Sequence, residues 1–465
     1  MKIDKLLILI SLVVVIIVGV FLALFLSNRS ICTNKHSITD EIIVEYIELQ
    51  PSHQDPVVVV EETPREDPIP VSPPCTNFSW VQRGMNFANA TGAGGTEDTV
   101  SLSSDANTVA VGIQRSAQVQ IFDWDGSDWI QRGTTIVGEV AGDHNGGSVS
   151  LSSDGNTIAI GAYRNDNVNG QGAGQVRIFD WDGSDWVQRG LSINGEVASD
   201  SNGFAVSLSS DGNTVAMSAI GSDALANNGG QTRIFDWNGN AWVQKGSSIN
   251  GQSNELSGWS ISLRNNGDTI AIGAPVSFNE PGFAYIFDWD GNDWVQRGLN
   301  IVGDHANDQS GYSISLSLDT NTVAIGARRN NIGGSGTGAI KIYDWDGSDW
   351  TQRGNVISGD NNGDNAGETI SLSDDGNSIG IGVKGVDNLD DPNQLKYEVG
   401  LVRIYDWNNN TMLWEPRGDD IKGVDQNDRT GTAVSLSADG NTFIASTPKL
   451  GSPGYIQVFD WACSE

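Results

Sequence analysis

Basic residues are scarce in this chain. Of its 465 residues only 26 are Lys or Arg, against 58 Asp or Glu, which gives a formal net charge of -32. Nucleic-acid phosphates attract clustered Lys and Arg, so this balance argues against a nucleic-acid partner. The simplest interpretation is a well-solvated acidic surface; affinity for divalent cations or basic partners is the alternative.

Residues that commonly carry catalysis are also few. The chain holds 4 His and 3 Cys, and only His144 and His305 fall within the repeats described below. Carboxylates recur at equivalent positions in repeat after repeat, whereas an active site needs different groups that converge on one point. We therefore expect no enzymatic activity and no cofactor or metal site.

Long apolar runs are missing beyond the N-terminus. Most apolar residues come in runs of four to six between Gly, Asn, Asp and Ser, which indicates strands and turns and an all-β class. The exception is LLILISLVVVIIVGVFLALFL at residues 6–26, long enough to cross a ~30 Å hydrocarbon core as a helix. A cleaved signal peptide usually has a shorter apolar core and a small-residue cleavage site, so residues 1–26 are interpreted as a cytoplasmic tip and an uncleaved transmembrane anchor.

Residues 27–74 predict a stalk. They include EETPREDPIPVSPP from Glu61 to Pro74, and proline-rich acidic sequence favours extended conformations without a core. Flanking charge does not orient the anchor, because Lys2 and Lys5 are balanced by Arg29 and Lys35. The cysteines and glycosylation motifs below favour a type II protein whose C-terminal domain, residues 75–465, is extracellular or lumenal.

The stretch IFDWDGSDWVQRG, residues 178–190, recurs through that domain. Its first tryptophan returns at intervals of 57, 56, 52, 56, 62 and 54 residues, which is typical of a repeat array or propeller. Each repeat contains four β-patterned runs, and tight turns such as SDGN and DGSD join the first to the second and the third to the fourth. Four antiparallel strands make one blade, so the sequence predicts a seven-bladed β-propeller.

The connections are expected to divide between two faces. Both tight turns fall on one face, while the second-to-third connections and the links between blades emerge on the other, where they are long and variable. Compare AYRNDNVNGQGAG from Ala162 with VKGVDNLDDPNQLKYEVG from Val383. Function tends to lie on irregular loops that a rigid scaffold carries.

One copy of the repeat is split between the two ends of the domain. WVQRG at residues 80–84 lacks a third strand before it, and IQVFDW at residues 456–461 lacks a fourth strand after it. Their overlap is expected to complete the seventh blade and to close the ring. Cys75 and Cys463 bracket this junction, where the other blades carry a short turn, so we predict a disulfide between them.

A disulfide implies an oxidising compartment, and three N-glycosylation motifs agree with it. They begin at Asn77, Asn89 and Asn409. The remaining cysteine, Cys32, lies beside the membrane, where it either links two chains or stays an inert thiol.

SGYSIS at Ser310 and IAIGAP at residues 270–275 resemble the two halves of FG-GAP repeats, which build the seven-bladed propeller of integrin α-subunits. The hairpin SVSLSSDGNTIAIGA followed by VRIFDW is similar to the WD-repeat strand pattern. Both resemblances imply the same strand order and overlapping closure. The calcium loop DxDxDG of many FG-GAP repeats is replaced by SDGN or by LDTN at Leu318, which offers too few oxygens for Ca²⁺.

Two sets of residues are candidates for ligand binding on the irregular face. The first is an acidic series three residues before the Gly that opens each inner strand, to be interpreted either as turn-capping carboxylates or as a cation or basic-ligand rim at the channel mouth. This series is Asp143, Asp200, Asp308, Asp364 and Asp428, with Glu255 in the fourth repeat.

The second set is aromatic: Phe204, Trp259 and Tyr312 occupy one position in three consecutive repeats, where other repeats carry Gly147, Glu368 and Thr432. These rings either bind sugars or a protein partner, or extend the apolar surface between blades. Taken together, the sequence favours a membrane-anchored surface protein that binds a protein or glycan. A glycan-acting propeller enzyme and a structural envelope component are the alternatives.

Overall fold

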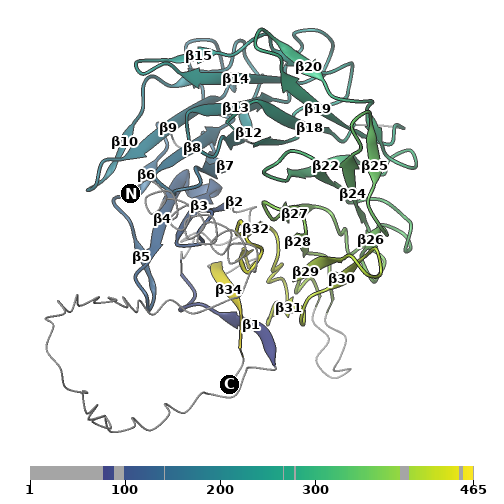
Figure 1. The fold of residues 1–465 in the computed structure, drawn as a ribbon. Coiled ribbons are helices and arrows are strands. Elements are labelled where there is room, and N and C mark those ends of the chain that lie inside the picture. The colour runs from purple at the N-terminus through teal and green to yellow at the C-terminus, as the bar shows by residue number, and fades with distance from the viewer. Residues whose placement is uncertain are drawn as a thin grey trace, which may run out of the picture. The chain divides into compact units, whose positions relative to one another are not determined.

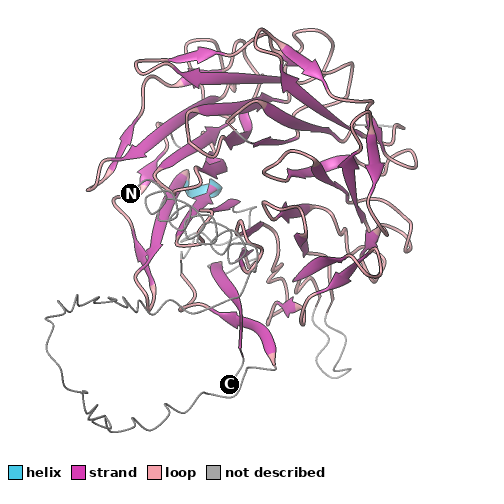
Figure 2. Cartoon of the chain, viewed as in Figure 1, coloured by secondary structure: helices cyan, strands magenta, loops and turns pink. Residues whose placement is uncertain are grey.

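A computed structural model describes residues 77–87, 99–140, 142–264, 266–276, 279–387, 397–449 and 454–463. Almost all of these residues lie in strands and connecting loops, and the described part contains one short 3-10 turn, η1 (Gln114–Ser116) (Figure 2). Within these ranges no helix is long and apolar enough to span a bilayer. The predicted anchor at residues 6–26 and the stalk at residues 27–74 lie outside them.

Residues Pro73 to Glu465 belong to one compact unit. Seven antiparallel sheets compose it, and Figure 1 shows them as blades around a common axis. The predicted all-β seven-bladed propeller is confirmed.

The first strand of each blade lies nearest the axis and contacts the first strands of both neighbouring blades. From blade 1 to blade 7 these inner strands are β2 (Thr99–Leu102), β7 (Asn145–Leu151), β12 (Asn202–Leu208), β17 (Ser260–Arg264), β22 (Ser310–Leu316), β27 (Thr369–Leu372) and β32 (Val434–Leu436).

The second strands are buried along their whole length, because a blade packs against each of their faces. They are β3 (Thr108–Ile113), β8 (Thr157–Ala162), β13 (Thr214–Ala219), β18 (Thr269–Ala274), β23 (Thr322–Ala327), β28 (Ser378–Val383) and β33 (Thr442–Thr447). The third strands carry the first tryptophan of the repeat: β4 (Gln118–Trp124), β9 (Gln175–Trp181), β14 (Gln231–Trp237), β19 (Phe283–Trp289), β24 (Ala339–Trp345), β29 (Leu401–Asn408) and β34 (Tyr455–Cys463).

The outer strands are short and carry the second tryptophan. They are β5 (Trp129–Gln131), β10 (Trp186–Gln188), β15 (Trp242–Gln244), β20 (Trp294–Gln296), β25 (Trp350–Gln352), β30 (Leu413–Pro416) and, in blade 7, β1 (Phe78–Gln82). After an Arg-Gly or Lys-Gly bulge the chain returns to the third strand in two-residue strands: β6 (Ile136–Val137), β11 (Ile193–Asn194), β16 (Ile249–Asn250), β21 (Ile301–Val302), β26 (Ile357–Ser358) and β31 (Ile421–Lys422).

The bulge explains why the outer strand ends before the Arg-Gly of WVQRG. Gly133 has φ +70°, and a Cβ there would lie 2.7 Å from the Trp181 ring and 3.1 Å from the Trp186 ring of the next blade. Only glycine both adopts this backbone and leaves room for the tryptophans. The indole N–H of Trp186 in turn donates to the Arg132 carbonyl of the bulge at 3.0 Å.

The same link joins every pair of neighbouring blades, and in the split blade Trp80 donates to the Arg417 carbonyl at 2.9 Å. The basic side chain of the bulge lies over the tryptophans of the next blade, as Arg132 lies 4.6 Å from the Trp181 ring centroid. Its guanidinium also donates to the Gly155 carbonyl at 3.1 Å, in the SDGN turn of the next blade. The repeated motif IFDWDGSDWVQRG therefore holds neighbouring blades together. We call this set of contacts, from the tryptophans and the bulge arginine or lysine, the tryptophan clamp.

The two ends of the domain complete one blade. β1 pairs antiparallel with β34, with Trp80 opposite Trp461 and Phe78 opposite Cys463. Cys463 is disulfide-bonded. Cys75 lies outside the described residues, so its pairing with Cys463 stays a prediction.

Serine hydroxyls join the inner strands around the axis. Ser150 Oγ of blade 2 accepts the N–H of Leu208 in blade 3 at 2.9 Å, and equivalent bonds occur at five further junctions. In blade 3 the N–H of Val206 is bound as well, to Ser148 Oγ at 3.0 Å. These N–H groups lie on the free edge of the inner strand, so the edge that faces the axis is already hydrogen-bonded.

Candidate functional site

In blades 2 to 7, two positions mark the inner rim on the face of the irregular loops. One is the residue that follows the Gly at the start of the first strand, and the other follows the end of the second strand. In blade 3 the start is offset by a register shift between Asn202 and Val206, and Gly203 has φ +84°. Phe204 emerges directly after this bulge and is partly exposed.

The predicted aromatic residues meet one another along this rim. The Phe204 and Trp259 ring centroids are 4.9 Å apart, and those of Trp259 and Tyr312 are 5.3 Å apart. The planes are tilted by 52° and 45°, a geometry that favours aromatic pairs. Three blades therefore present one continuous band of partly exposed rings.

Sequence reasoning missed two members of this band. Tyr163 follows the second strand of blade 2, and its ring centroid lies 5.5 Å from that of Phe204. The ring centroid of His144 lies 5.0 Å from that of Tyr163. Blade 2 carries Gly147 at the position of Phe204, and a Cβ on Gly147 would lie 3.0 Å from the Tyr163 ring. Tyr163 thus fills the gap that the glycine leaves. We call His144, Tyr163, Phe204, Trp259 and Tyr312 the aromatic arc.

One end of the arc is polar. The Tyr163 hydroxyl lies 2.8 Å from His144 Nδ1 and accepts a hydrogen bond from Gln114 Nε2 at 2.8 Å. Burial and the nearby Arg164 lower the pKa of His144, against the opposing effect of Asp143. The imidazole is therefore neutral at pH 7, and its Nδ1 is hydrogen-bonded to the Tyr163 hydroxyl.

The other end of the arc is charged. The Arg328 guanidinium lies 3.9 Å from the Tyr312 ring centroid and forms an ion pair with Glu368 at 3.4 Å. Lys384 forms an ion pair with the same carboxylate. Two hydrogen-bond donors, Arg328 and Lys384, and one acceptor, Glu368, therefore lie next to one another at this end of the arc.

The acidic series is held within its own loops. Its carboxylates are buried and accept backbone N–H groups of their own loops, as Asp364 accepts those of Asp360 and Asn361 at 2.9 and 2.8 Å. The same contacts occur at Asp143, Asp200, Asp308, Asp428 and Glu255. This geometry is that of a capping carboxylate, so we do not include the series in the candidate site.

Asp304, His305 and Asp308 are the acidic and imidazole groups close enough for a shared cation in the described part of the chain. Asp304 is ion-paired with Lys341, and Asp308 accepts from Asn330 Nδ2 at 2.7 Å. A lysine ammonium thus already neutralises Asp304, and we do not include these residues in the candidate site.

The glycosylation motifs fall on different parts of the chain. Asn77 and Asn409 are exposed, the latter in the outer turn of blade 6, where its Oδ1 accepts from Trp407 Nε1 at 2.9 Å. Asn89 and Cys32 lie outside the described residues. Glycosylation stays a prediction at all three asparagines.

No family model matches the chain, and a search of curated proteins finds no match. Solved structures do match: 772 chains resemble it. One is the β-propeller domain of Cps50 (Swd1) from Myceliophteria thermophila, which shares 10% identity at a TM-score of 0.53 over 81% of this chain and 99% of that one. At this identity the likeness concerns the fold alone. The chain is a seven-bladed propeller with WD-repeat-like blades, and the resemblance to FG-GAP repeats finds no support in these comparisons.

Proposed function

We propose that this protein is a binding module that holds a protein or glycan ligand at the inner rim of its propeller. The aromatic arc carries this proposal. Its rings come from four consecutive blades and are in mutual contact, and they are flanked by hydrogen-bonding groups at both ends. Partly exposed aromatics bordered by polar groups are typical of ligand sites.

The proposed ligand meets side chains rather than backbone. Because Ser148 and Ser150 already bind the free-edge N–H groups of β12, a peptide has little backbone to pair with there, and strand addition is disfavoured. Sugar rings or aromatic and aliphatic side chains are the groups that the arc suits.

We further propose the setting that the sequence indicates: a type II protein anchored by residues 6–26, with the propeller extracellular or lumenal on its stalk. Cys32 would link two chains of such a protein. The disulfide state of Cys463 is consistent with an oxidising compartment.

A screen of the full-length chain against a glycan array and against intact cell surfaces tests this function. Trp259→Ala and Phe204→Ala are expected to abolish capture of whichever ligand the wild type retains. Leu299→Ala is the control, because this side chain is 72% exposed in the bend between β20 and β21, at the outer edge of its blade. Unchanged capture by Trp259→Ala together with a lower Tm would assign the arc to packing.

A glycan-acting enzyme is the second candidate, because Arg328, Glu368 and Lys384 gather unlike groups beside the arc. It predicts release of reducing sugar from array-positive glycans, and Glu368→Gln would stop that release. We expect binding without turnover.

A further inference from the structure

An aspartate of the outer turn closes the contact between neighbouring blades. In blade 2, Asp185 Oδ1 accepts the N–H of Trp186 at 2.9 Å and the N–H of Thr134, from the bulge of blade 1, at 2.8 Å. Both of these donors are backbone groups, and the Thr134 hydroxyl donates to the same carboxylate as well, at 3.0 and 2.9 Å. One carboxylate oxygen thus satisfies a donor from each blade.

The same pair of bonds recurs at three other junctions, where Asp128, Asp293 and Asp349 accept from Met85, Ser247 and Leu299. At the junction of blades 5 and 6 the acceptor is the side-chain amide oxygen of Asn355 in place of an aspartate, and the Trp414 N–H donates to it at 2.8 Å. An oxygen acceptor is therefore the rule at this place, and it is present at five of the seven junctions.

The junction of blades 2 and 3 breaks the rule. The outer turn of blade 3 reads Asn238, Gly239, Asn240, Ala241, so both aspartates of the DGSD turn are missing. Ala241 offers no oxygen to the N–H groups of Leu191 and Trp242. Among the described residues the N–H of Leu191 has no hydrogen-bond partner, and the Leu191 side chain is 88% exposed.

A pocket of about 710 Å³ opens at this junction. Leu191 and Trp242 line it, together with the amides of Asn194, Asn240 and Gln244. Trp242 is partly exposed, whereas its counterpart Trp186 is 8% exposed. The volume is in the range of small-ligand sites.

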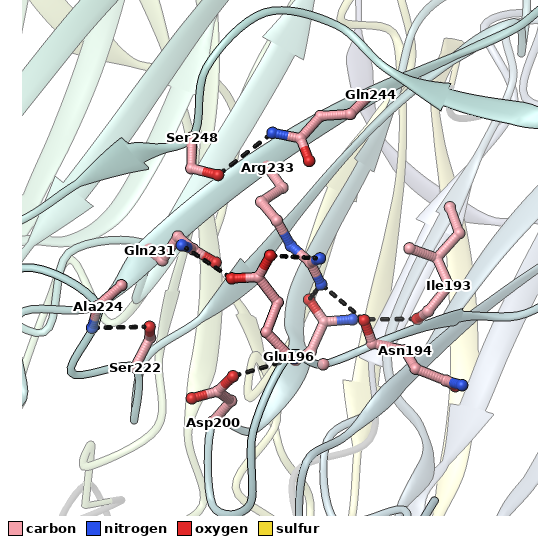
Figure 3. A network of polar contacts seen from close by, with 12 residues as sticks. Ile193, Asn194, Glu196, Asp200, Ser222, Ala224, Gln231, Arg233, Gln244 and Ser248 are labelled. Carbon is pink, nitrogen blue, oxygen red and sulfur yellow. Dashed lines mark hydrogen bonds and ion pairs between the residues drawn. The ribbon is translucent and has the colours of Figure 1, made fainter. Parts of the chain in front are cut away.

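The charge at this pocket differs from that of the surrounding acidic surface. Arg233 lies in its wall, with 7% of its side chain exposed, and Figure 3 shows its guanidinium between Glu196 and the Asn194 carbonyl, which it contacts at 3.6 and 2.8 Å. Arg189 lies 5.7 Å from the Trp242 ring centroid. Since the turn has lost both of its carboxylates, an anion meets less repulsion here than at the equivalent DGSD turns.

We propose that this pocket binds a sugar residue that carries a carboxylate, such as a uronic acid. One carboxylate oxygen of the ligand takes the place of the missing aspartate oxygen and accepts the N–H groups of Leu191 and Trp242. The sugar ring packs on Trp242 and Leu191, and the three amides bind its hydroxyls. The site is separate from the aromatic arc and does not depend on the function proposed for it.

Titration of the full-length chain with glucuronic acid and its oligomers, followed by the fluorescence of the chain and by calorimetry, tests the proposal. Glucose and acetate are the matched probes that lack the carboxylate and the ring, respectively. We expect glucuronate to bind at least about tenfold more tightly than either, because charge-assisted bonds add to ring stacking. Equal binding of glucose, equal binding of acetate, or no binding of glucuronate would overturn it.

The decisive variant is Ala241→Asp, which supplies the internal carboxylate that four other junctions possess. It should weaken glucuronate binding at least about tenfold while leaving Tm unchanged or higher, so that lost binding does not reflect lost folding. Leu299→Ala is the matched control, because Leu299 stands at the position of Leu191 in a junction whose Asp349 already accepts its N–H, and it should leave glucuronate binding unchanged. Undiminished binding to a well-folded Ala241→Asp chain, or loss of binding in Leu299→Ala, would contradict the assignment.

Discussion

Pairs of glycines set how closely neighbouring blades approach. Gly382, in the second strand of blade 6, faces the backbone of Gly431 at the start of blade 7, and a Cβ on Gly382 would overlap the Gly431 carbonyl oxygen. The same overlap would occur at Gly112, Gly161, Gly273 and Gly326. The glycine of the GA dipeptide, which resembles half of an FG-GAP motif, is therefore required by contact between blades.

Gly382→Ala is expected to lower the free energy of unfolding by roughly 1 to 3 kcal/mol or more, because backbone must move to relieve the overlap. Gly380→Ala in the same strand is the matched control: its Cβ would meet the side-chain ends of Ile404 and Val434, each at 3.2 Å, and the nearest backbone atom, the Ser371 carbonyl oxygen, lies at an ordinary contact distance of 3.9 Å. Urea unfolding of both variants measures the difference. Equal destabilisation would show that close approach at Gly382 is not what selects glycine.

At the scale of single residues the sequence predicted part of the candidate site. Phe204, Trp259 and Tyr312 share one repeat position and could be found by alignment of the repeats. Tyr163 could not be found that way, because it reaches the same place from the second strand. The sequence did contain a signal for it. Blade 2 has a glycine, Gly147, where other blades have a side chain, and it is also the one blade in which a tyrosine follows the second strand.

Among the repeated elements, the tryptophan clamp gives a direct test of how blades are joined. Trp186→Phe keeps an aromatic ring but removes the N–H that donates to the Arg132 carbonyl. The expected loss is about 1 kcal/mol, measured by urea unfolding. Trp181→Phe is the control from the same blade, since Trp181 Nε1 makes no hydrogen bond to any described residue. A smaller loss for Trp186→Phe than for Trp181→Phe would argue against the clamp.

The SDGN turn makes the propeller sensitive to acid. Burial raises the pKa of Asp154, but hydrogen bonds from Ser152 and Asn156 outweigh it and bring the pKa below its ordinary value of 3.8. The folded state then binds this proton more weakly than the unfolded state. The carboxylate therefore contributes stability above pH 3.8 that is lost as pH falls through the lower folded value.

The pKa is lowered in the same way at Asp105, Asp211, Asp319, Asp375 and Asp439. We expect Tm to fall steeply below about pH 4, and Asp154→Asn to reduce the steepness, because one contributor no longer titrates. Calorimetric scans from pH 6 to pH 2.5 measure both. A Tm that is independent of pH in this interval would contradict the assignment.

At the scale of the whole molecule, the ring of blades is closed by the pairing of β1 with β34 and by the disulfide of Cys463, which lies at the end of β34. If Cys75 is the partner of Cys463, Cys463→Ser should lower Tm by several degrees, because opening so long a loop adds entropy to the unfolded chain. Peptide mapping without reductant identifies the pair. Cys32→Ser is the control: it should leave Tm unchanged and remove any covalent dimer. An unchanged Tm in Cys463→Ser would place closure on strand pairing alone.

The architecture was more predictable than the candidate binding sites. Tryptophan spacing and Asp-Gly turns determine the number of blades and their strand order, because those features depend on local backbone chemistry. The pocket and the aromatic arc arise where repeats differ, as at Ala241 and Gly147. The effect of such a difference depends on which side chains of the neighbouring blade or strand lie against it, and these contacts cannot be derived from the repeat alone.

The tryptophan clamp is the same at the blade that is assembled from both ends of the domain as at the other blades. Trp80 donates to the Arg417 carbonyl as Trp186 donates to that of Arg132. The propeller thus has no privileged first blade. Joining the natural ends with a short DGSD-like turn and opening the chain between Gly291 and Asn292, in an exposed outer turn, should yield a circular permutant with the same ring. Which blade is synthesised first, and at which blade the chain enters and leaves the ring, can therefore be changed by evolution or by design without altering the scaffold.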